Sequence, residues 1–321
     1  MDFEINVLRG GEIRILQLTD MQVIDSSQQR YEGRLPGEQP VWWEYEKKEE
    51  NLYCYIRELV KRTNPDLIII TGDITYGEFD DSGRSQTEFV EFMESFKIPW
   101  APIYGNHDNE TYMGIEWQNE QYENAKNCLF KKGDVSGNGN YSIAVKQNGV
   151  LNRMIYMMDS NGCGKLKIEE GFRADQLEWL KKSASEADVP GFVCMHIPNK
   201  DFADAFIAAG YQDKYDTKDD FAQFELSPET SNGDFGAKHE WIKASEIHGS
   251  YLQLYKECRI DGAFAGHWHK INTCVMYEGI RFVLGLKTGV YDYHDKDAMG
   301  GILITLCGKE FSVRHEYCEI K

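Results

Sequence analysis

The sequence has no long apolar run. No stretch of the 321-residue chain approaches the roughly 18–20 consecutive apolar residues that a membrane-spanning helix needs. The first eleven residues are polar and lack the basic start and apolar core of an export signal. We therefore expect a cytoplasmic protein that makes no contact with a membrane.

Basic residues are few relative to acidic ones. Lysine and arginine together number 35 against 53 aspartates and glutamates, which leaves a formal net charge of −18. A field of that sign repels long polyanions, so no nucleic-acid partner is expected. A small phosphorylated substrate is still compatible with this charge, because bound cations dominate the field inside a metal site.

Internal repeats, heptad runs and Pro- or Ser-rich linkers are also absent, so nothing divides the chain into separate domains. Its length and its 13% aromatic content suffice for one large core. We predict a single domain over residues 1–321, with its core at about 12–306. The eight cysteines lack C-x-x-C spacing and are interpreted as reduced core thiols. The sequence predicts no oligomeric state.

Five short polar segments each follow a strand-like apolar run. Because the ends of neighbouring strands meet at one edge of a sheet, we expect these side chains to converge. Glycines precede several of them, where a turn under a ligand requires close backbone approach. The segments are Asp20–Gln22, Gly72–Asp73, Gly105–Asp108, His196 and Gly266–His269.

The residue types in these segments indicate a metal site. Carboxylates, amide oxygens and imidazoles suit Zn²⁺, Mn²⁺ and iron, and the lack of thiolates argues against a closed structural zinc site. A shared carboxylate can bridge two metals about 3.5–4 Å apart, an arrangement that clamps both oxygens of a displacement at phosphorus. Asp73 is the candidate bridge. His267 and His269, two residues apart, would point to the same side of an extended segment.

The segments resemble the signature of the calcineurin-like metallophosphoesterase family, which reads D-x-H, G-D, G-N-H-[DE], H and G-H-x-H in that order. The resemblance extends over about residues 13–306 and is greatest to the purple-acid-phosphatase-like branch. It implies two divalent or trivalent metal ions (Mn, Fe or Zn) and hydrolysis by a metal-bound hydroxide. It also implies that His107 protonates the leaving oxygen and that Asp108 orients His107. The implied metal ligands are Asp20, Gln22, Asp73 and His269 for the first ion, and Asp73, Asn106, His196 and His267 for the second.

Gln22 departs from the signature, because the family usually has histidine there. An amide oxygen is a weaker donor than imidazole toward zinc or iron. Three outcomes follow: Gln22 ligates through its oxygen, a water takes its place, or the first ion binds only together with substrate phosphate. We expect retained activity with altered metal preference, toward Mn²⁺.

The periodicity of the chain predicts the fold. Strands at 12–18, 67–70 and 100–104 alternate with helices at 46–63 and 85–97, which indicates parallel strands joined by right-handed crossovers. Segments 141–145 and 153–158 are predicted to begin a second sheet, completed by strands at 273–277, 281–284, 301–306 and 311–316. The predicted class is α/β, or α+β sandwich: two mixed sheets packed face to face and flanked by helices. Residues 25–45, with Trp42 and Trp43, are interpreted as a lid or rim loop.

Two classes of function compete. The first is a metallophosphoesterase, with phosphomonoesters favoured and phosphodiesters possible. The alternative is a degenerate single-metal member that acts as a binding or regulatory scaffold, because Gln22 weakens one site. A nuclease is a third interpretation, which the acidic balance disfavours.

Overall fold

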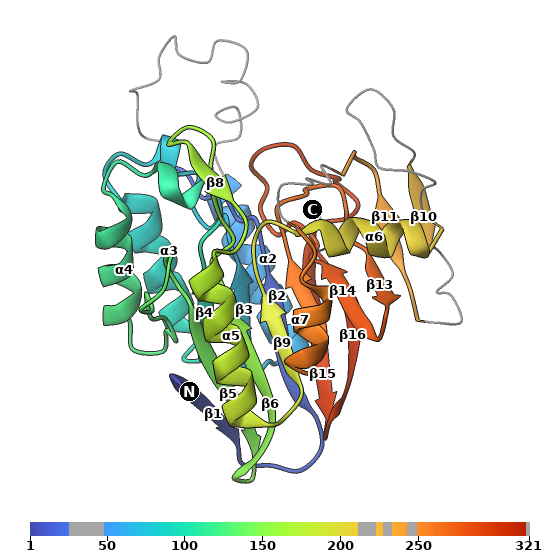
Figure 1. The fold of residues 1–321 in the computed structure, drawn as a ribbon. Coiled ribbons are helices and arrows are strands. Elements are labelled where there is room, and N and C mark those ends of the chain that lie inside the picture. The colour runs from blue at the N-terminus through green and yellow to red at the C-terminus, as the bar shows by residue number, and fades with distance from the viewer. Residues whose placement is uncertain (26–47, 211–222, 227–232, 243–248, 319–321) are drawn as a thin grey trace.

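Two large β-sheets face each other in the computed structural model, as Figure 1 shows. It describes all residues except 26–47, 211–222, 227–232, 243–248 and 319–321. The predicted lid with Trp42 and Trp43 therefore falls almost entirely outside the described residues. The mixed two-sheet architecture confirms the predicted fold class.

The five-stranded sheet has the order β16-β15-β2-β3-β4. Its strands β2, β3 and β4 are parallel, as predicted, and helices α2 and α3 connect them. The last two strands, β15 and β16, also belong here, because β15 pairs antiparallel with β2. Their prediction in the second sheet was wrong, since an alternating pattern shows which face a residue takes but not which strand it pairs with. The bounds are β2 Ile13–Leu18, α2 Lys48–Thr63, β3 Leu67–Thr71, α3 Arg84–Ser95, β4 Trp100–Ile103, β15 Gly300–Cys307 and β16 Glu310–Tyr317.

The seven-stranded sheet has the order β1-β5-β6-β9-β12-β14-β13. Its centre is parallel, with β6, β9, β12 and β14 running in one direction. The first strand, β1, was not predicted and pairs parallel with β5 at the sheet edge. The bounds are β1 Phe3–Val7, β5 Tyr141–Gln147, β6 Val150–Met157, β9 Gly191–Cys194, β12 Ile260–Ala265, β13 Cys274–Tyr277 and β14 Ile280–Leu284.

Alternation along the central strands builds two hydrophobic layers. On β9, Phe192 and Cys194 point into the core between the sheets, whereas Val193 packs on the opposite face. That outer face is covered by α5 (Ala174–Ala187), α6 (Lys200–Ala208) and α7 (Leu252–Glu257). Such strands are buried on both faces, which explains their nearly continuous apolar sequences.

The remaining described elements are short. Helix α4 spans Ile115–Asn124. Two small ribbons pair β7 (Asn161–Cys163) with β8 (Ile168–Glu170), and β10 (Phe224–Leu226) with β11 (Gly236–Lys238). None of the eight cysteines, all of which lie in the described part of the chain, forms a disulfide bond, and five of them are buried. None of the described helices is long and apolar enough to cross a bilayer.

Candidate metal centre

The five polar segments converge beyond the carboxyl ends of parallel strands from both sheets. Two groups of potential ligands form there, and in each the ligand atoms lie within 4.8 Å of one another. Asp73 belongs to both groups, as expected of a bridging carboxylate. The groups are Asp73, His196 and His267, and Asp20, Asp73 and His269.

Histidine orientation is fixed by backbone carbonyls. Nδ1 of His196 lies 2.8 Å from the carbonyl oxygen of Thr71, and Nδ1 of His269 lies 3.0 Å from that of Tyr293. Each contact turns Nε2 toward a carboxylate: His196 Nε2 is 3.3 Å from Asp73 Oδ2, and His269 Nε2 is 3.3 Å from Asp20 Oδ1. Metal-ligating histidines are usually held in this way through the other ring nitrogen.

Three buried ligand atoms are left without a hydrogen-bond partner among the described residues. They are Asp20 Oδ1, Asn106 Oδ1 and His196 Nε2. A buried polar atom without a hydrogen bond costs free energy, and the 3.3 Å ion-pair contacts of Asp20 Oδ1 and His196 Nε2 join the candidate ligands to one another. Asp20 and His196 belong to the two groups of potential ligands, and the donor set of carboxylates, imidazoles and an amide oxygen therefore fits bound cations.

The electrostatics of the site favour positive charge. Burial raises the pKa of the Asp73 carboxyl, but His196 and His107 outweigh burial and hold that pKa well below its usual range. Burial likewise opposes protonation of His196, yet Asp73 raises the pKa of this imidazole to about 9. The carboxylates thus stabilise a cation here, whether it is an imidazolium or a metal ion.

The backbone is strained where the ligands leave their strands. Asp20, Asp73 and His267 have φ angles of 53°, 49° and 74°. Such left-handed conformations are uncommon outside glycine, and they cluster at functional sites where the surroundings enforce them. Gly105 shows how tight the turns are, because a Cβ added to it would lie 2.1 Å from Asp73 Oδ1. The predicted need for glycine before Asn106 is thereby explained.

Gly72 provides a stability test of the same packing. A Cβ on Gly72 would lie 2.6 Å from the His196 ring, at a φ of +86°. Gly279 has a nearly equal φ of +84° but open space around it. We expect Gly279→Ala to cost about 1–3 kcal/mol from backbone strain, and Gly72→Ala to cost about 1–3 kcal/mol more from overpacking. Urea unfolding of both variants measures the difference; equal costs would contradict the close approach.

His107 lies beside Asp73 and is oriented by Glu110. Its Nδ1 is 2.9 Å from Glu110 Oε2, its backbone N–H donates to Asp73 Oδ1 at 2.9 Å, and its ring stacks on Tyr76 at 4.0 Å. Burial lowers the pKa of His107, but Asp73 and Glu110 outweigh burial and raise it to about 9. The ring is therefore protonated at neutral pH, with Nε2 as the nitrogen left to face the cavity.

Asp108 does not orient His107, contrary to the hypothesis from the sequence. Its carboxylate accepts hydrogen bonds from the backbone N–H groups of Gly105, at 2.7 Å, and Thr75, at 2.8 Å. It therefore braces the two turns that carry Asp73 and Asn106. Glu110 was missed, although its position three residues after His107 was a signal for the contact that it makes.

Gln22 is buried at the first metal position, but its amide is already engaged. Lys287 Nζ donates to Gln22 Oε1 at 2.6 Å, and Gln22 Nε2 lies 3.4 Å from Asp73 Oδ2. Sequence reasoning missed Lys287. The only local signal is a lysine close to the end of the apolar strand β14.

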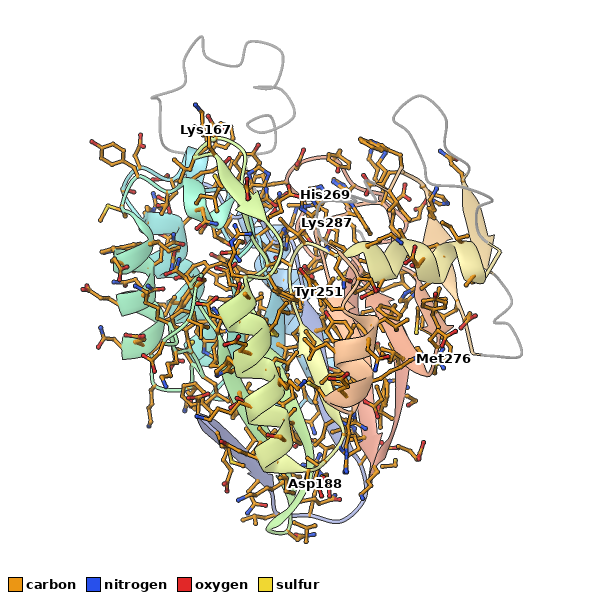
Figure 2. All side chains as sticks on the ribbon, in the orientation of Figure 1. Lys167, Asp188, Tyr251, His269, Met276 and Lys287 are labelled. Atoms are coloured by element: carbon orange, nitrogen blue, oxygen red, sulfur yellow. The ribbon has the colours of Figure 1, made fainter. Side chains whose placement is uncertain are left out.

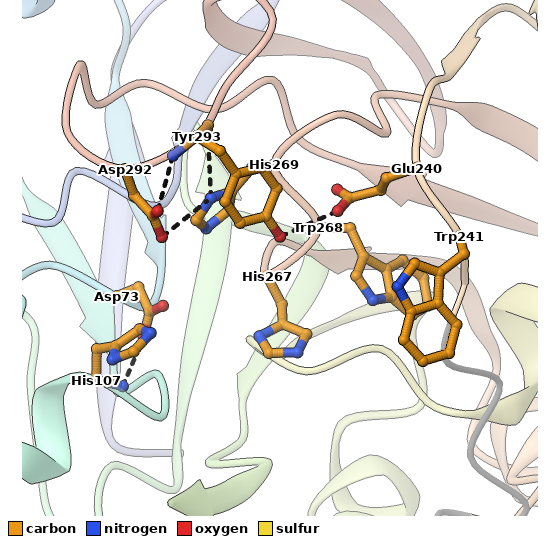
Figure 3. Close-up of a pocket in the computed structure, with 9 residues that line it drawn as sticks. All are labelled: Asp73, His107, Glu240, Trp241, His267, Trp268, His269, Asp292 and Tyr293. Carbon is orange, nitrogen blue, oxygen red and sulfur yellow. Dashed lines mark hydrogen bonds and ion pairs between the residues drawn. The ribbon is translucent and has the colours of Figure 1, made fainter. Parts of the chain in front are cut away.

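A cavity of about 370 Å³ opens onto the two groups of ligands (Figure 3). Glu240 accepts a hydrogen bond from the Tyr293 hydroxyl at 3.0 Å, and Asp292 Oδ2 is 3.7 Å from His269 Nδ1. Sequence reasoning did not single out these rim residues. The cavity is lined by Asp73, His107, Glu240, Trp241, His267, Trp268, His269, Asp292 and Tyr293.

The sequence profile of the calcineurin-like phosphoesterases matches residues 13–270. The chain belongs to this family. The match covers strand β2 through the Gly266–His269 segment, and so contains every predicted ligand.

Relatives of this chain include two Arabidopsis thaliana proteins. "Probable inactive purple acid phosphatase 29" is 23% identical over 318 residues, which cover 89% of this chain and 73% of the relative. "Probable inactive purple acid phosphatase 14" is 24% identical over 321 residues, which cover 88% of this chain and 72% of the relative. Among solved structures, purple acid phosphatase PPD1 from yellow lupin (Lupinus luteus) seeds is similar, with a TM-score of 0.49 and 14% identity, covering 96% of this chain and 52% of that one.

Proposed function

We propose that this phosphoesterase hydrolyses small phosphate esters, with monoesters favoured, in a metal-dependent reaction. One observation supports the proposal above all: Asp20 Oδ1, Asn106 Oδ1 and His196 Nε2 are buried without hydrogen-bond partners among the described residues, and Asp20 and His196 group with the shared Asp73. Burying these atoms without a hydrogen-bond partner lowers the stability of the fold, whereas bound cations would give all three a partner. Mn²⁺ is the ion that we favour.

Metal ions bound at these positions would supply Lewis-acid polarisation of a phosphoryl oxygen and activation of a water molecule. The chain supplies the rest. Asp73 faces both positions and holds the loop of His107 through the backbone N–H. His107, protonated and fixed by Glu110, is placed to donate its proton to the departing ester oxygen.

The cavity supports a small substrate. Its volume of about 370 Å³ is in the range of small-molecule sites. Glu240 and Asp292 stand on its rim, and no lysine or arginine lines it in the part of the chain that the structure describes. A polyanion such as nucleic acid would find no basic side chains in this cavity to contact its phosphate backbone, and such contacts drive its binding. Similarity to purple acid phosphatases supports monoesters over diesters.

The alternative is a binding or regulatory scaffold. Two observations favour it: Gln22 stands where the family has histidine, and both Arabidopsis relatives carry the word "inactive" in their names. Against it stand the protonated His107 and its intact contacts to Asp73 and Glu110.

Turnover of three substrates separates these functions. Protein stripped with a chelator and reloaded with Mn²⁺ should release p-nitrophenol from p-nitrophenyl phosphate, more slowly from the bis ester, and leave single-stranded DNA intact. The stripped protein should be inactive until Mn²⁺ is restored. Metal binding without turnover of either ester would favour the scaffold instead.

A further inference from the structure

Gln22 is held between two charged groups at the first metal position. Lys287 Nζ donates to its Oε1 at 2.6 Å and to the backbone carbonyl of Asp20 at 3.0 Å. On the other side, Gln22 Nε2 lies 3.4 Å from Asp73 Oδ2. Gln22 and Lys287 are 0% and 2% exposed, so neither side chain has solvent as an alternative partner.

The chemistry of these neighbours fixes the orientation of the amide. A lysine amino group at this position donates hydrogen bonds, so the oxygen of Gln22 must face it. The reverse orientation would place NH₂ against the amino group and the carbonyl oxygen against the Asp73 carboxylate. Gln22 therefore presents its NH₂ to the metal-facing carboxylate, and an amide NH₂ is not a metal ligand.

The unpaired atoms of the site agree with this orientation. Asp20 Oδ1, Asn106 Oδ1 and His196 Nε2 all lack hydrogen-bond partners among the described residues, whereas Gln22 Oε1 has one. The second position keeps the four ligands that the resemblance implies, and three of them, Asp73, His196 and His267, form one group in the structure. The first keeps three, which are Asp20, Asp73 and His269.

Lys287 is fixed in this place by its own loop. The neighbouring Thr288 N–H donates to the Thr19 carbonyl at 2.9 Å, and Gly289 N–H to the Asp20 carbonyl at 3.2 Å. A Cβ on Gly289 would lie 2.1 Å from the Met21 carbonyl oxygen, so the loop packs directly on the Asp20–Gln22 turn. Figure 2 labels Lys287 and His269 in the upper central part of the view. An amino group held here keeps the Gln22 oxygen turned away from the first position.

We propose that the Lys287–Gln22 pair makes the two cation positions unequal, with a tight second position and a weak first position. The inference rests on the proposed metal centre and specifies which of its positions is compromised and by which residues. Gln22 acts as a hydrogen-bond donor to Asp73 and not as a ligand. The protein as isolated then holds one tight equivalent of metal.

Calorimetric titration of chelator-stripped protein with Mn²⁺, with metal content measured after dialysis, tests this. Wild type should show one tight equivalent and a second that is weaker by about 10- to 100-fold, the range by which groups next to ligands alter metal affinity. The double variant Gln22→His with Lys287→Met supplies an imidazole and removes the amino group. It should tighten the weaker equivalent, the metal ion at the first position, by a similar factor. Lys181→Met, at an exposed lysine, is the matched control and should change neither affinity.

A second variant keeps the test decisive if the double variant fails to fold. Lys287→Met removes only the amino group and should tighten the weaker equivalent by about tenfold, while the tight equivalent stays within about threefold of wild type, because the hydrogen bonds of Lys287 go to Asp20 and Gln22 at the first position. A weaker equivalent that is unchanged in Lys287→Met would overturn the inference, as would two equal equivalents in wild type. A wild-type protein that binds no Mn²⁺ would overturn the metal centre itself, and with it the proposed function.

Discussion

Replacing Asp73 by asparagine is expected to abolish both tight metal binding and turnover of phosphate esters. Asp73 is the one residue shared by the two groups of ligands, and its carboxylate also receives the His107 N–H. Asparagine keeps the shape but removes the negative charge and one ligand oxygen. Turnover should fall by a factor on the order of 10³ or more, as when one member of a cooperating unit is removed.

The matched control is Asp188→Asn. Asp188 has a similar positive φ of 53°, but its side chain is 77% exposed and forms only a surface ion pair with Arg259. Exposed ion pairs contribute little to stability, so this variant should keep the metal content and the turnover rate of the wild type. Metal content by mass spectrometry and initial rates measure both variants. An Asp73→Asn protein that retains either property would exclude Asp73 as the bridge.

Replacing His107 by alanine is expected to slow turnover by about 10²- to 10⁴-fold, the usual contribution of a positioned acid or base. Asp73 and Glu110 raise the pKa of His107 to about 9 against the effect of burial, so the ring carries a proton at neutral pH. An alkyl phosphate needs that proton on its departing oxygen. The loss should therefore be large for alkyl monoesters and much smaller for p-nitrophenyl phosphate, whose leaving group departs without protonation.

The metal content of the variant distinguishes proton donation by His107 from a role in holding the metal site together. His107→Ala should bind as much metal as wild type, because His107 belongs to neither group of ligands. The control His315→Ala makes the same change on β16, outside the lining of the cavity. Loss of metal from His107→Ala, or an equal rate loss for both kinds of ester, would contradict the assignment of His107 as the acid.

The convergence of the candidate ligands and the parallel strands could be predicted because both depend on local patterns. An apolar strand followed by glycine and a polar residue specifies where a side chain leaves the sheet, and five such ends converge in the structure. The sheet to which β15 and β16 belong could not be predicted, because the pairing of β15 with β2 joins residues at opposite ends of the chain. Strand patterns carry no information on such partners.

The contacts of the side chains were harder to predict than their positions. Glu110 and Asp108 are both acidic and close to His107, and only the turn geometry directs Glu110 to the ring and Asp108 to the backbone. The contact between Lys287 and Gln22 spans 265 positions of sequence and leaves no periodic signal. The departure of Gln22 from the family signature was visible in the sequence, but its partner was not.

Anomalous diffraction from crystals grown with Mn²⁺ and phosphate tests the central claim most directly, because it locates the ions rather than their effects. We expect the strongest peak among Asp73, Asn106, His196 and His267, and a weaker peak or none beside Asp20 and His269. Peaks confined to surface carboxylates, with these side chains still unpaired, would contradict the account.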